Sequence, residues 1–219
     1  MNLYGSVAIQ SKLSDSVIVS YSGGKESAVV LDLCHNHFKK VSVFFMFQVP
    51  GLSFQEAQLR WAEKRYCLEI YRLPHFEVSH FMRTGTFCKA DPSIPNVTIS
   101  DVYAHVRGVF DTHWIAAGER SKDSVVRAAM IKKSGSIDEQ RGRFYPIAWW
   151  DKAQTLKYLE VNKIKFDAGK NALGRSFGKL APQNMAALKK FFPEDYAKVE
   201  QAFPLIGAST AHHEMYANA

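Results

Sequence analysis

The sequence predicts an α/β fold: a five-stranded, mostly parallel sheet with helices on both faces, followed by a short helical C-terminal extension. Short apolar runs rich in β-branched residues alternate with segments of helical periodicity along the first 165 residues. These runs are apolar throughout, which is typical of parallel strands covered on both faces. Hydrophobic residues make up 47% of the 219 residues, enough for such a core.

The first half of the chain is predicted to supply three strands and two helices. The strands are short runs of β-branched and aromatic residues, at 16–20, 41–47 and 68–73. Pro74 closes the third run, because proline cannot donate to a sheet hydrogen bond. Two segments between these strands repeat apolar residues at helical spacing, at 26–36 and 54–67.

The second half continues the alternation after an interruption. Residues 75–100 include Pro92 and Pro95 and show no clear period, which predicts an irregular loop. Two further strands are predicted at 113–117 and 143–147. The helices around them are predicted at 101–110, 123–133 and 151–161. Asp151 and Gln154 have the spacing of a capping box at the start of the last helix.

The composition changes near residue 165, which predicts a domain boundary. Residues 1–165 are expected to form the α/β domain, and 166–219 a helical and irregular extension. The extension opens with Gly169, Gly174 and Gly178 and continues with two short predicted helices at 182–192 and 193–203.

Charge and cysteine content narrow the function classes. The net charge of +7 favours anionic partners such as nucleotides or nucleic acid, although a scattered basic surface explains it equally well. The three cysteines contain no CxxC pair, which argues against disulfides, iron–sulfur clusters and structural zinc. No histidine set has metal-ligand spacing either, so no protein-held metal site is expected.

The same features predict the compartment. A reduced, cytoplasmic setting is expected for three unpaired cysteines, and the N-terminal residues lack the apolar core of an export signal. The longest strongly apolar run is too short to span a bilayer, so no membrane association is expected. The sequence leaves open whether the chain forms a homo-oligomer.

One stretch has the chemistry of a phosphate-binding loop. Residues 17–33 read VIVSYSGGKESAVVLDL, so a glycine-rich turn lies between a predicted strand and a predicted helix. A helix N-terminus there offers unpaired N–H groups, glycine allows close backbone approach, and Lys25 adds a charge. The spacing is not that of a Walker A loop, because Val19 and Glu26 stand where Gly and Ser or Thr are required. A simple strand-to-helix turn is the competing interpretation.

The loop resembles that of a known superfamily. Residues 22–27, SGGKES, are similar to the SGGxDS loop of the PP-loop adenine-nucleotide α-hydrolases, also called N-type ATP pyrophosphatases. Residues 118–127, GERSKDSVVR, resemble the GxRxxES..R segment of its phosphoadenylyl sulfate reductase branch. Residues 146–151, PIAWWD, resemble a further block of that branch. The resemblance covers about residues 15–165 and implies a five-stranded parallel sheet that binds an adenine nucleotide.

The chain also departs from the reductases. Those enzymes use a C-terminal cysteine as nucleophile, whereas no cysteine follows Cys88 in this sequence. Lys25 is present where many reductases lack a lysine, which favours ATP with Mg²⁺ over phosphoadenylyl sulfate. We therefore expect an enzyme of sulfur metabolism or a related pathway that cleaves the α–β phosphate bond of ATP and adenylates a small-molecule or nucleic-acid acceptor. A sulfur-transfer enzyme with an external thiol and a non-catalytic nucleotide-binding protein remain as alternatives.

The resemblance also assigns roles to particular residues. Lys25 and Arg120 are the predicted catalytic residues, with Lys25 at the pyrophosphate and Arg120 at the α-phosphate or the second substrate. Arg127 is a further candidate anion contact, although an ion pair with Asp123, four residues earlier, would explain it equally well. The complete predicted nucleotide-binding set is Ser20, Tyr21, Ser22, Gly23, Gly24, Lys25, Glu26, Ser27, Gly118, Arg120 and Arg127.

Overall fold

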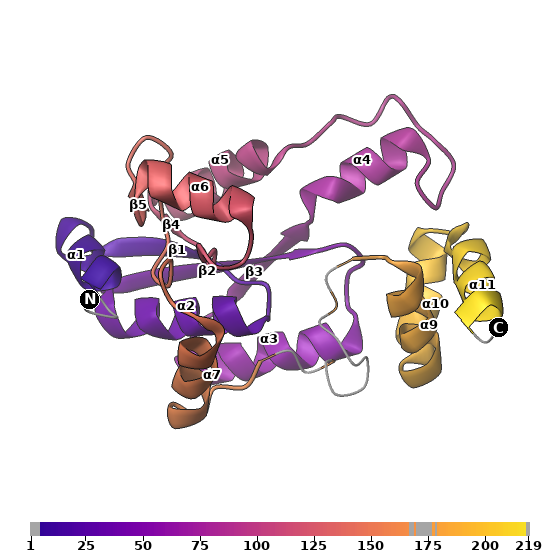
Figure 1. The fold of residues 1–219 in the computed structure, drawn as a ribbon. Helices are drawn as coiled ribbons and strands as arrows, with labels where there is room; N and C mark the ends of the chain where they lie inside the picture. The colour runs from indigo at the N-terminus through magenta and orange to yellow at the C-terminus, as the bar shows by residue number, and fades with distance from the viewer. Residues whose placement is uncertain (1–4, 167–168, 170–176, 178, 218–219) are drawn as a thin grey trace. The chain divides into compact units, whose positions relative to one another are not determined.

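The computed structural model describes residues 5–166, 169, 177 and 179–217 (Figure 1). The chain divides into two compact units, each assembled from separate segments. The first unit comprises Met1–Phe45, Leu59–Arg72 and Tyr103–Phe166, and the second comprises Met46–Gln58, Leu73–Val102 and Asp167–Ala219. The structure thus groups two segments of the first 165 residues with the C-terminal part of the chain.

A six-stranded sheet forms the centre of the α/β architecture. Its strand order is β3-β2-β1-β4-β6-β5. The strands are β1 (Ser16–Ser20), β2 (Lys40–Phe47), β3 (Ile70–Pro74), β4 (Ile115–Ala116), β5 (Ile137–Asp138) and β6 (Arg143–Phe144). β1 pairs in parallel with β2 and β4, β4 pairs in parallel with β6, and β5 alone is recorded as antiparallel to its neighbour. The five predicted strands and the mostly parallel sheet are confirmed.

The sixth strand was not predicted. β5 has two residues, too few for a periodic signal in the sequence. It is held by pairing with β6, with Ile137 opposite Phe144 and Asp138 opposite Arg143. A contact of this kind depends on tertiary structure and leaves no local pattern.

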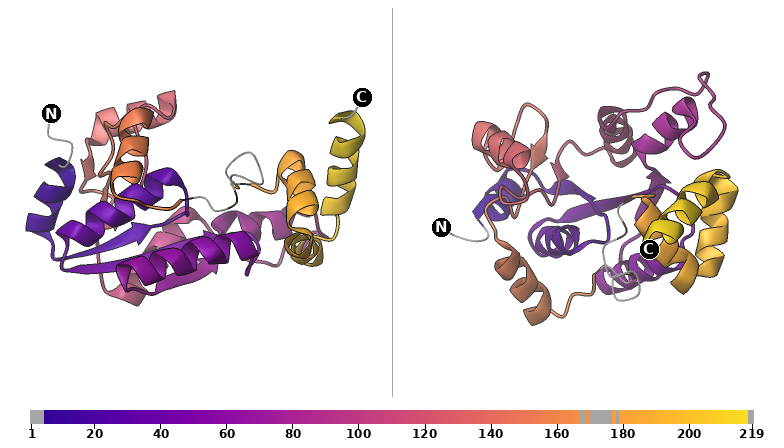
Figure 2. Two further views of the ribbon diagram at one scale, coloured as in Figure 1. Left: turned by 90° about the horizontal axis from the view of Figure 1, so that it is seen from below. Right: turned by 45° about the vertical axis from the view of Figure 1, so that its right-hand side comes forward.

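Helices cover both faces of the sheet, as predicted. Figure 1 shows α2 (Lys25–His37) and α3 (Ser53–Tyr66) along one face, with α5 (Ile99–Phe110) and α6 (Val125–Ser134) on the other. α7 (Lys152–Val161) packs against α2, and the capping box predicted at Asp151 and Gln154 is present. An additional helix, α1 (Gly5–Leu13), also contacts α2 and is visible beside it in Figure 2. None of the helices within the described residues is both long and apolar enough to cross a bilayer.

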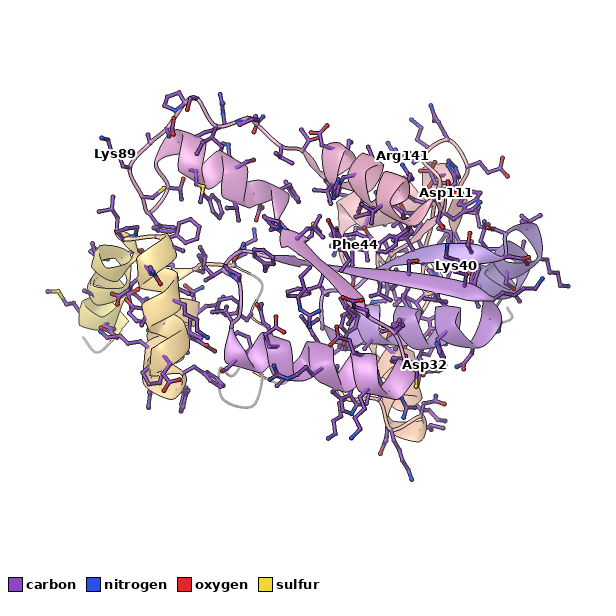
Figure 3. All side chains as sticks on the ribbon, turned by 180° about the vertical axis from the view of Figure 1, so that it is seen from behind. Asp32, Lys40, Phe44, Lys89, Asp111 and Arg141 are labelled. Atoms are coloured by element: carbon purple, nitrogen blue, oxygen red, sulfur yellow. The ribbon has the colours of Figure 1, made fainter. Side chains whose placement is uncertain are left out.

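α2 is buried along most of its length, and a buried carboxylate fixes it. All residues from Ser27 to Cys34 are buried. Asp32, labelled in Figure 3, accepts hydrogen bonds from Tyr66 of α3 at 2.9 Å and Tyr158 of α7 at 2.7 Å. Asn36 donates a third at 3.1 Å. Because a buried charge is stable only when it is hydrogen-bonded, this network fixes the helix whose N-terminus begins at the glycine-rich loop.

The second unit has a hydrophobic core of its own. Its C-terminal helices are α9 (Pro182–Phe191), α10 (Pro193–Ala202) and α11 (Ile206–Ala217). The buried residues of this core are Val49, Leu52, Phe54, Leu180, Met185, Leu188, Tyr196, Val199, Phe203 and Ile206. The two helices predicted after residue 181 are confirmed, and α11 was missed. Of the predicted glycine stretch, Gly174 and Gly178 lie outside the described residues.

The prediction of an irregular loop over residues 75–100 was wrong in its first part. Residues Phe76–Thr84 form α4, which ends at Gly85 with a left-handed φ of 77°. Val78 and Phe81 pack against the core of the second unit. This tertiary contact supports a helix of only nine residues, which is too short to be stable alone or to show a clear period.

Asp195 ties α10 to the start of α3 within the second unit. It is 1% exposed, and one of its oxygens accepts hydrogen bonds from the backbone N–H and the Oγ of Ser53, both at 2.7 Å. Lys198 Nζ contacts the other oxygen at 2.9 Å. Burial favours the neutral acid, but the Ser53 hydrogen bonds and the Lys198 charge outweigh it and hold the pKa of Asp195 below its usual value.

Asp195→Ala is therefore expected to lower the free energy of unfolding by about 2 kcal/mol at pH 7, because it removes a helix cap and leaves Ser53 unpaired. Since the folded pKa is depressed, the contribution is complete above the unfolded pKa and is lost as pH falls through the folded pKa. Denaturant unfolding should show the gap to wild type at pH 7 and a smaller gap below about pH 4. Glu194→Ala, at the exposed neighbouring position, is the control. An equal loss in both variants would contradict the capping role.

Candidate functional site

A polar pocket of about 490 Å³ lies in the first unit, where β1 and β4 end. Ligands of open parallel sheets bind at this edge, beyond the carboxyl ends of adjacent strands. The pocket volume is within the range of small-molecule sites. The lining residues are Ser20, Ser22, Lys25, Glu26, Ser27, Gly118, Glu119, Arg120, Asp123 and Arg127.

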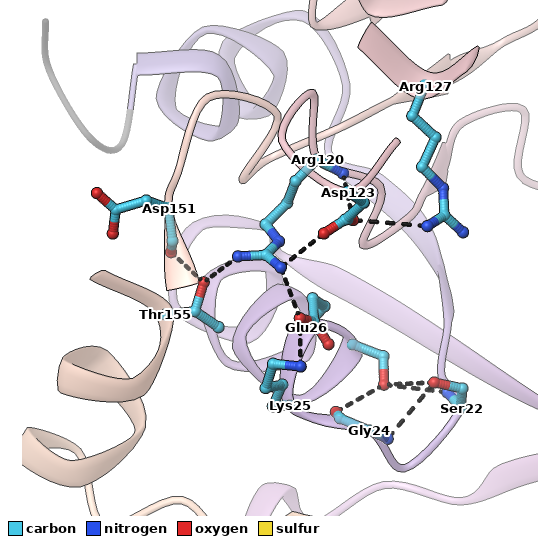
Figure 4. A network of polar contacts seen from close by, with 10 residues as sticks. Ser22, Gly24, Lys25, Glu26, Arg120, Asp123, Arg127, Asp151 and Thr155 are labelled. Carbon is cyan, nitrogen blue, oxygen red and sulfur yellow. Dashed lines mark hydrogen bonds and ion pairs between the residues drawn. The ribbon is translucent and has the colours of Figure 1, made fainter. Parts of the chain in front are cut away.

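The glycine-rich loop is shaped by its own two serines (Figure 4). Ser27 Oγ lies 3.1 Å from Ser22 Oγ, accepts a hydrogen bond from the Ser22 N–H at 3.1 Å and donates one to the Gly24 carbonyl at 3.0 Å. Gly23 adopts a φ of 75°, a conformation that favours glycine. The serines thus stabilise the turn that leads from β1 into α2.

The first turn of α2 is open towards a ligand. Gly24 is the N-cap residue, and no side chain caps the helix. A helix N-terminus without a side-chain cap offers its N–H groups and the positive end of its dipole to an anion. Gly118, after β4, packs closely against this turn: a Cβ atom there would lie 3.1 Å from Glu26 Cβ and 3.2 Å from Ser27 N. Only a glycine allows the two segments to approach so closely.

A chain of alternating charges crosses the pocket, and Figure 4 shows all its members. Lys25 Nζ lies 2.9 Å from Glu26, and Glu26 lies 3.1 Å from Arg120 Nη2. Arg120 also contacts Asp123 at 2.6 Å, and Asp123 contacts Arg127 at 3.6 Å. The residues that were predicted to meet phosphate therefore pair with carboxylates in this structure. The ion pair between Arg127 and Asp123 is present, as the competing interpretation of Arg127 required.

Arg120 gives the clearest sign of a ligand. Its side chain is 8% exposed, and its Nη1 donates a long hydrogen bond of 3.5 Å to Thr155. Its Nε is buried and has no hydrogen-bond partner among the described residues. Buried guanidinium groups are normally fully hydrogen-bonded, so an unpaired donor beside an uncapped helix N-terminus fits an anion-binding site.

Glu119 is a pocket residue that the sequence analysis missed. Its carboxylate accepts a hydrogen bond of 2.8 Å from Arg143 on β6. Arg143 in turn lies against the rings of Tyr103, at 4.9 Å, and Tyr145, at 5.4 Å. Burial raises the pKa of both tyrosines, so they remain neutral beside the guanidinium. The partner residue, Arg143, is 24 positions away in sequence, so no local motif marks this pair.

The structure brings most of the predicted site residues together. Eight line the pocket: Ser20, Ser22, Lys25, Glu26, Ser27, Gly118, Arg120 and Arg127. Gly23 and Gly24 form the turn without being part of the lining. Tyr21, predicted near a ribose, is 2% exposed and belongs to the core, because its side chain follows the alternation of β1 inward. Asp123, considered before only as a partner of Arg127, also lines the pocket.

The donor set fits a nucleotide phosphate with a magnesium ion. No group of three His, Cys, Asp or Glu residues that could hold a metal occurs in the described part of the chain. Mg²⁺ is commonly bound by one or two carboxylates together with substrate phosphates, and Glu26 and Glu119 both line the pocket. These two residues are therefore the candidates to share such an ion with a bound polyphosphate.

Comparisons with solved structures identify the fold. The chain is similar to the phosphate complex of a phosphoadenylyl-sulfate reductase from Candida auris, with a TM-score of 0.55 and 16% identity over 82% of this chain and 88% of that one. It is also similar to the U34-tRNA thiolase NcsA from Methanococcus maripaludis, with a TM-score of 0.52 and 15% identity over 94% and 76% of the two chains. The fold is that of the PP-loop adenine-nucleotide α-hydrolases, as the loop predicted.

Sequence comparison gives the family. A search of curated proteins found no match. The family described as the phosphoadenosine phosphosulfate reductase domain matches residues 16–168, which is more than half of the chain and contains every residue that lines the pocket. The chain therefore belongs to the phosphoadenosine phosphosulfate reductase domain family.

Proposed function

We propose that this protein binds ATP at the pocket and cleaves its α–β phosphate bond, transferring the adenylate group to an acceptor. The observation that carries the proposal is the buried, unpaired Nε of Arg120 beside the uncapped N-terminus of α2. Together they offer N–H donors from a helix start and from a guanidinium group to one set of phosphate oxygens. A polyphosphate is the nucleotide group best suited to so many donors.

The residues present divide the work in a definite way. The N–H groups of the first turn of α2 and the Nζ of Lys25 would hold the pyrophosphate portion, which leaves as the new bond forms. Arg120 would stabilise the charge that develops at the α-phosphate, because its position is fixed by Asp123 and Thr155. A bound Mg²⁺ supplies charge neutralisation and alignment of the phosphates. Positioning and electrostatics suffice for this chemistry, since the attacking group comes from the acceptor.

The cysteines support adenylation rather than attack by a thiol of this chain. None of the three lines the pocket. Cys34 is fully buried, and burial raises the pKa of its thiol far above the usual value, which keeps it protonated and unreactive. Membership of the reductase domain family favours a second candidate, a sulfur-transfer reaction in which an external thiol is the electron donor.

Lys25→Ala is expected to weaken the binding of ATP with Mg²⁺ by about tenfold, because it removes one charged contact to phosphate. Isothermal titration calorimetry measures the effect, and release of pyrophosphate from ATP measures the reaction. Lys122→Ala is the matched control: Lys122 lies two residues from Arg120 but is 61% exposed and does not line the pocket.

The same titrations separate the candidate functions. Tight binding of ATP, with pyrophosphate release that Lys25→Ala reduces, supports adenylation. Tight binding of phosphoadenylyl sulfate without binding of ATP would contradict it and favour sulfur transfer. Equal losses of affinity in Lys25→Ala and Lys122→Ala would show that the pocket is not the site of binding.

A further inference from the structure

Glu26 occupies the position in the pocket where a phosphate oxygen would be expected. A single oxygen, Oε1, lies 2.9 Å from Lys25 Nζ and 3.1 Å from Arg120 Nη2. These are the two cations assigned to the phosphates in the proposed function. A carboxylate and a phosphate offer cations the same kind of anionic oxygen, so Glu26 and a ligand compete for the same partners.

Glu26 cannot readily move away from this position. Its backbone and Cβ are packed against Gly118, where an added Cβ would lie 3.1 Å from Glu26 Cβ and 3.2 Å from Glu26 C. The residue also belongs to the first turn of α2, a helix that is buried along most of its length. Its carboxylate therefore stays at the pocket when an anion enters, with 23% of the side chain exposed.

An anion that takes Lys25 and Arg120 from Glu26 leaves a negative charge beside the bound phosphate. A charge separated from its ion-pair partner opposes binding, and like charges in close contact repel each other. The pocket contains no excess of cations to offset this, since its lining has three basic and three acidic residues. A divalent cation removes the conflict, because carboxylate and phosphate oxygens are both its preferred ligands.

We propose that Glu26 is a specificity-determining residue that admits polyphosphate complexed with a divalent cation and rejects metal-free anions. The inference rests on the proposed function and names its substrate class as the metal complex of a nucleoside polyphosphate. Lys25 and Arg120 alone would bind sulfate, free phosphate or a metal-free sulfonucleotide; with Glu26 between them, each of these ligands meets an uncompensated carboxylate.

Titration with pyrophosphate tests the inference, with a chelator in one arm and MgCl₂ in the other. Glu26→Gln keeps the size of the side chain and removes its charge. Metal-free pyrophosphate is expected to bind this variant about tenfold more tightly than wild type. The affinity ratio between the two arms, large in wild type, is expected to shrink by the same factor.

Glu119→Gln separates this effect from a general change in the field of the pocket. It removes the same charge from the same lining, but Glu119 contacts Arg143 instead of Lys25 or Arg120. Its gain in metal-free affinity is expected to be clearly smaller. An equal gain in Glu119→Gln, or no gain in Glu26→Gln, would overturn the inference.

The wild-type protein provides a test that needs no variant. If Glu26→Gln fails to fold in a thermal melt, the two arms of the wild-type titration decide: metal-free pyrophosphate that binds as tightly as the magnesium complex overturns the inference. Binding of the magnesium complex without an effect of Glu26→Gln refutes the inference alone. Binding of neither pyrophosphate nor ATP in any arm refutes the proposed function as well.

Discussion

Arg120→Met is expected to lower the free energy of unfolding by about 2 kcal/mol and to weaken ATP binding by about 100-fold. The stability loss follows because Arg120 is the common partner of Glu26, at 3.1 Å, and Asp123, at 2.6 Å. Breaking a buried ion pair costs about 3–5 kcal/mol, but both carboxylates are partly exposed and keep Lys25 and Arg127 as partners, so the lower figure applies. The affinity loss reflects removal of several charge-assisted hydrogen bonds to phosphate.

Denaturant unfolding and calorimetric titration measure the two effects separately, and Arg127→Met is the control. Arg127 contacts only one of these carboxylates, at 3.6 Å, with its side chain 50% exposed. Its removal should therefore cost about 0.5 kcal/mol or less of stability. Arg120→Lys should recover much of the stability but little of the affinity, because an ammonium group lacks the planar fork of donors. Equal stability losses for Arg120→Met and Arg127→Met would contradict the central position of Arg120.

The parts of the fold that could be predicted from sequence are those with a local cause. β1 and β2 are buried runs of β-branched and aromatic residues, and the capping box at Asp151 depends on residues three positions apart. α4 and β5 were missed because their causes are distant in sequence. α4 depends on contacts of Val78 and Phe81 with the core of the second unit, and β5 depends on pairing with β6.

The candidate site divides in the same way. The loop at residues 22–27 is contiguous, and its chemistry can be deduced from helix geometry and residue type alone. The pairing of Glu26 with Arg120 joins positions 94 residues apart (120 − 26), and it exists because β1 and β4 are neighbours in the sheet. Sequence alone identified both cations but not the carboxylates between them, so it predicted an open phosphate site where the structure has a balanced one.

Gly118→Val is expected to disrupt the site by overpacking. The first side-chain atom alone would lie 3.2 Å from the backbone atoms Glu26 C and Ser27 N, and the two γ-methyl groups need further space. Because the first turn of α2 is backbone and cannot rotate away, the loop must shift. We expect a loss of about 2 kcal/mol in stability and about 100-fold in ATP affinity, the latter because donors displaced by a few tenths of an ångström no longer converge on one phosphate. Gly118→Ala should show both effects to a smaller extent.

Gly108→Ala is the matched control for this prediction, because it places the same added methyl group at another glycine of the first unit. Gly108 lies within α5, and a Cβ there would meet no atom within 4 Å. Alanine is the better helix former, so this variant should be as stable as wild type or more stable by about 0.5–1 kcal/mol. Unfolding and ATP titration of both alanine variants isolate the close approach between β4 and α2 as the cause. If Gly118→Ala binds ATP as tightly as Gly108→Ala does, the packing of Gly118 against Glu26 is not what positions the phosphate loop.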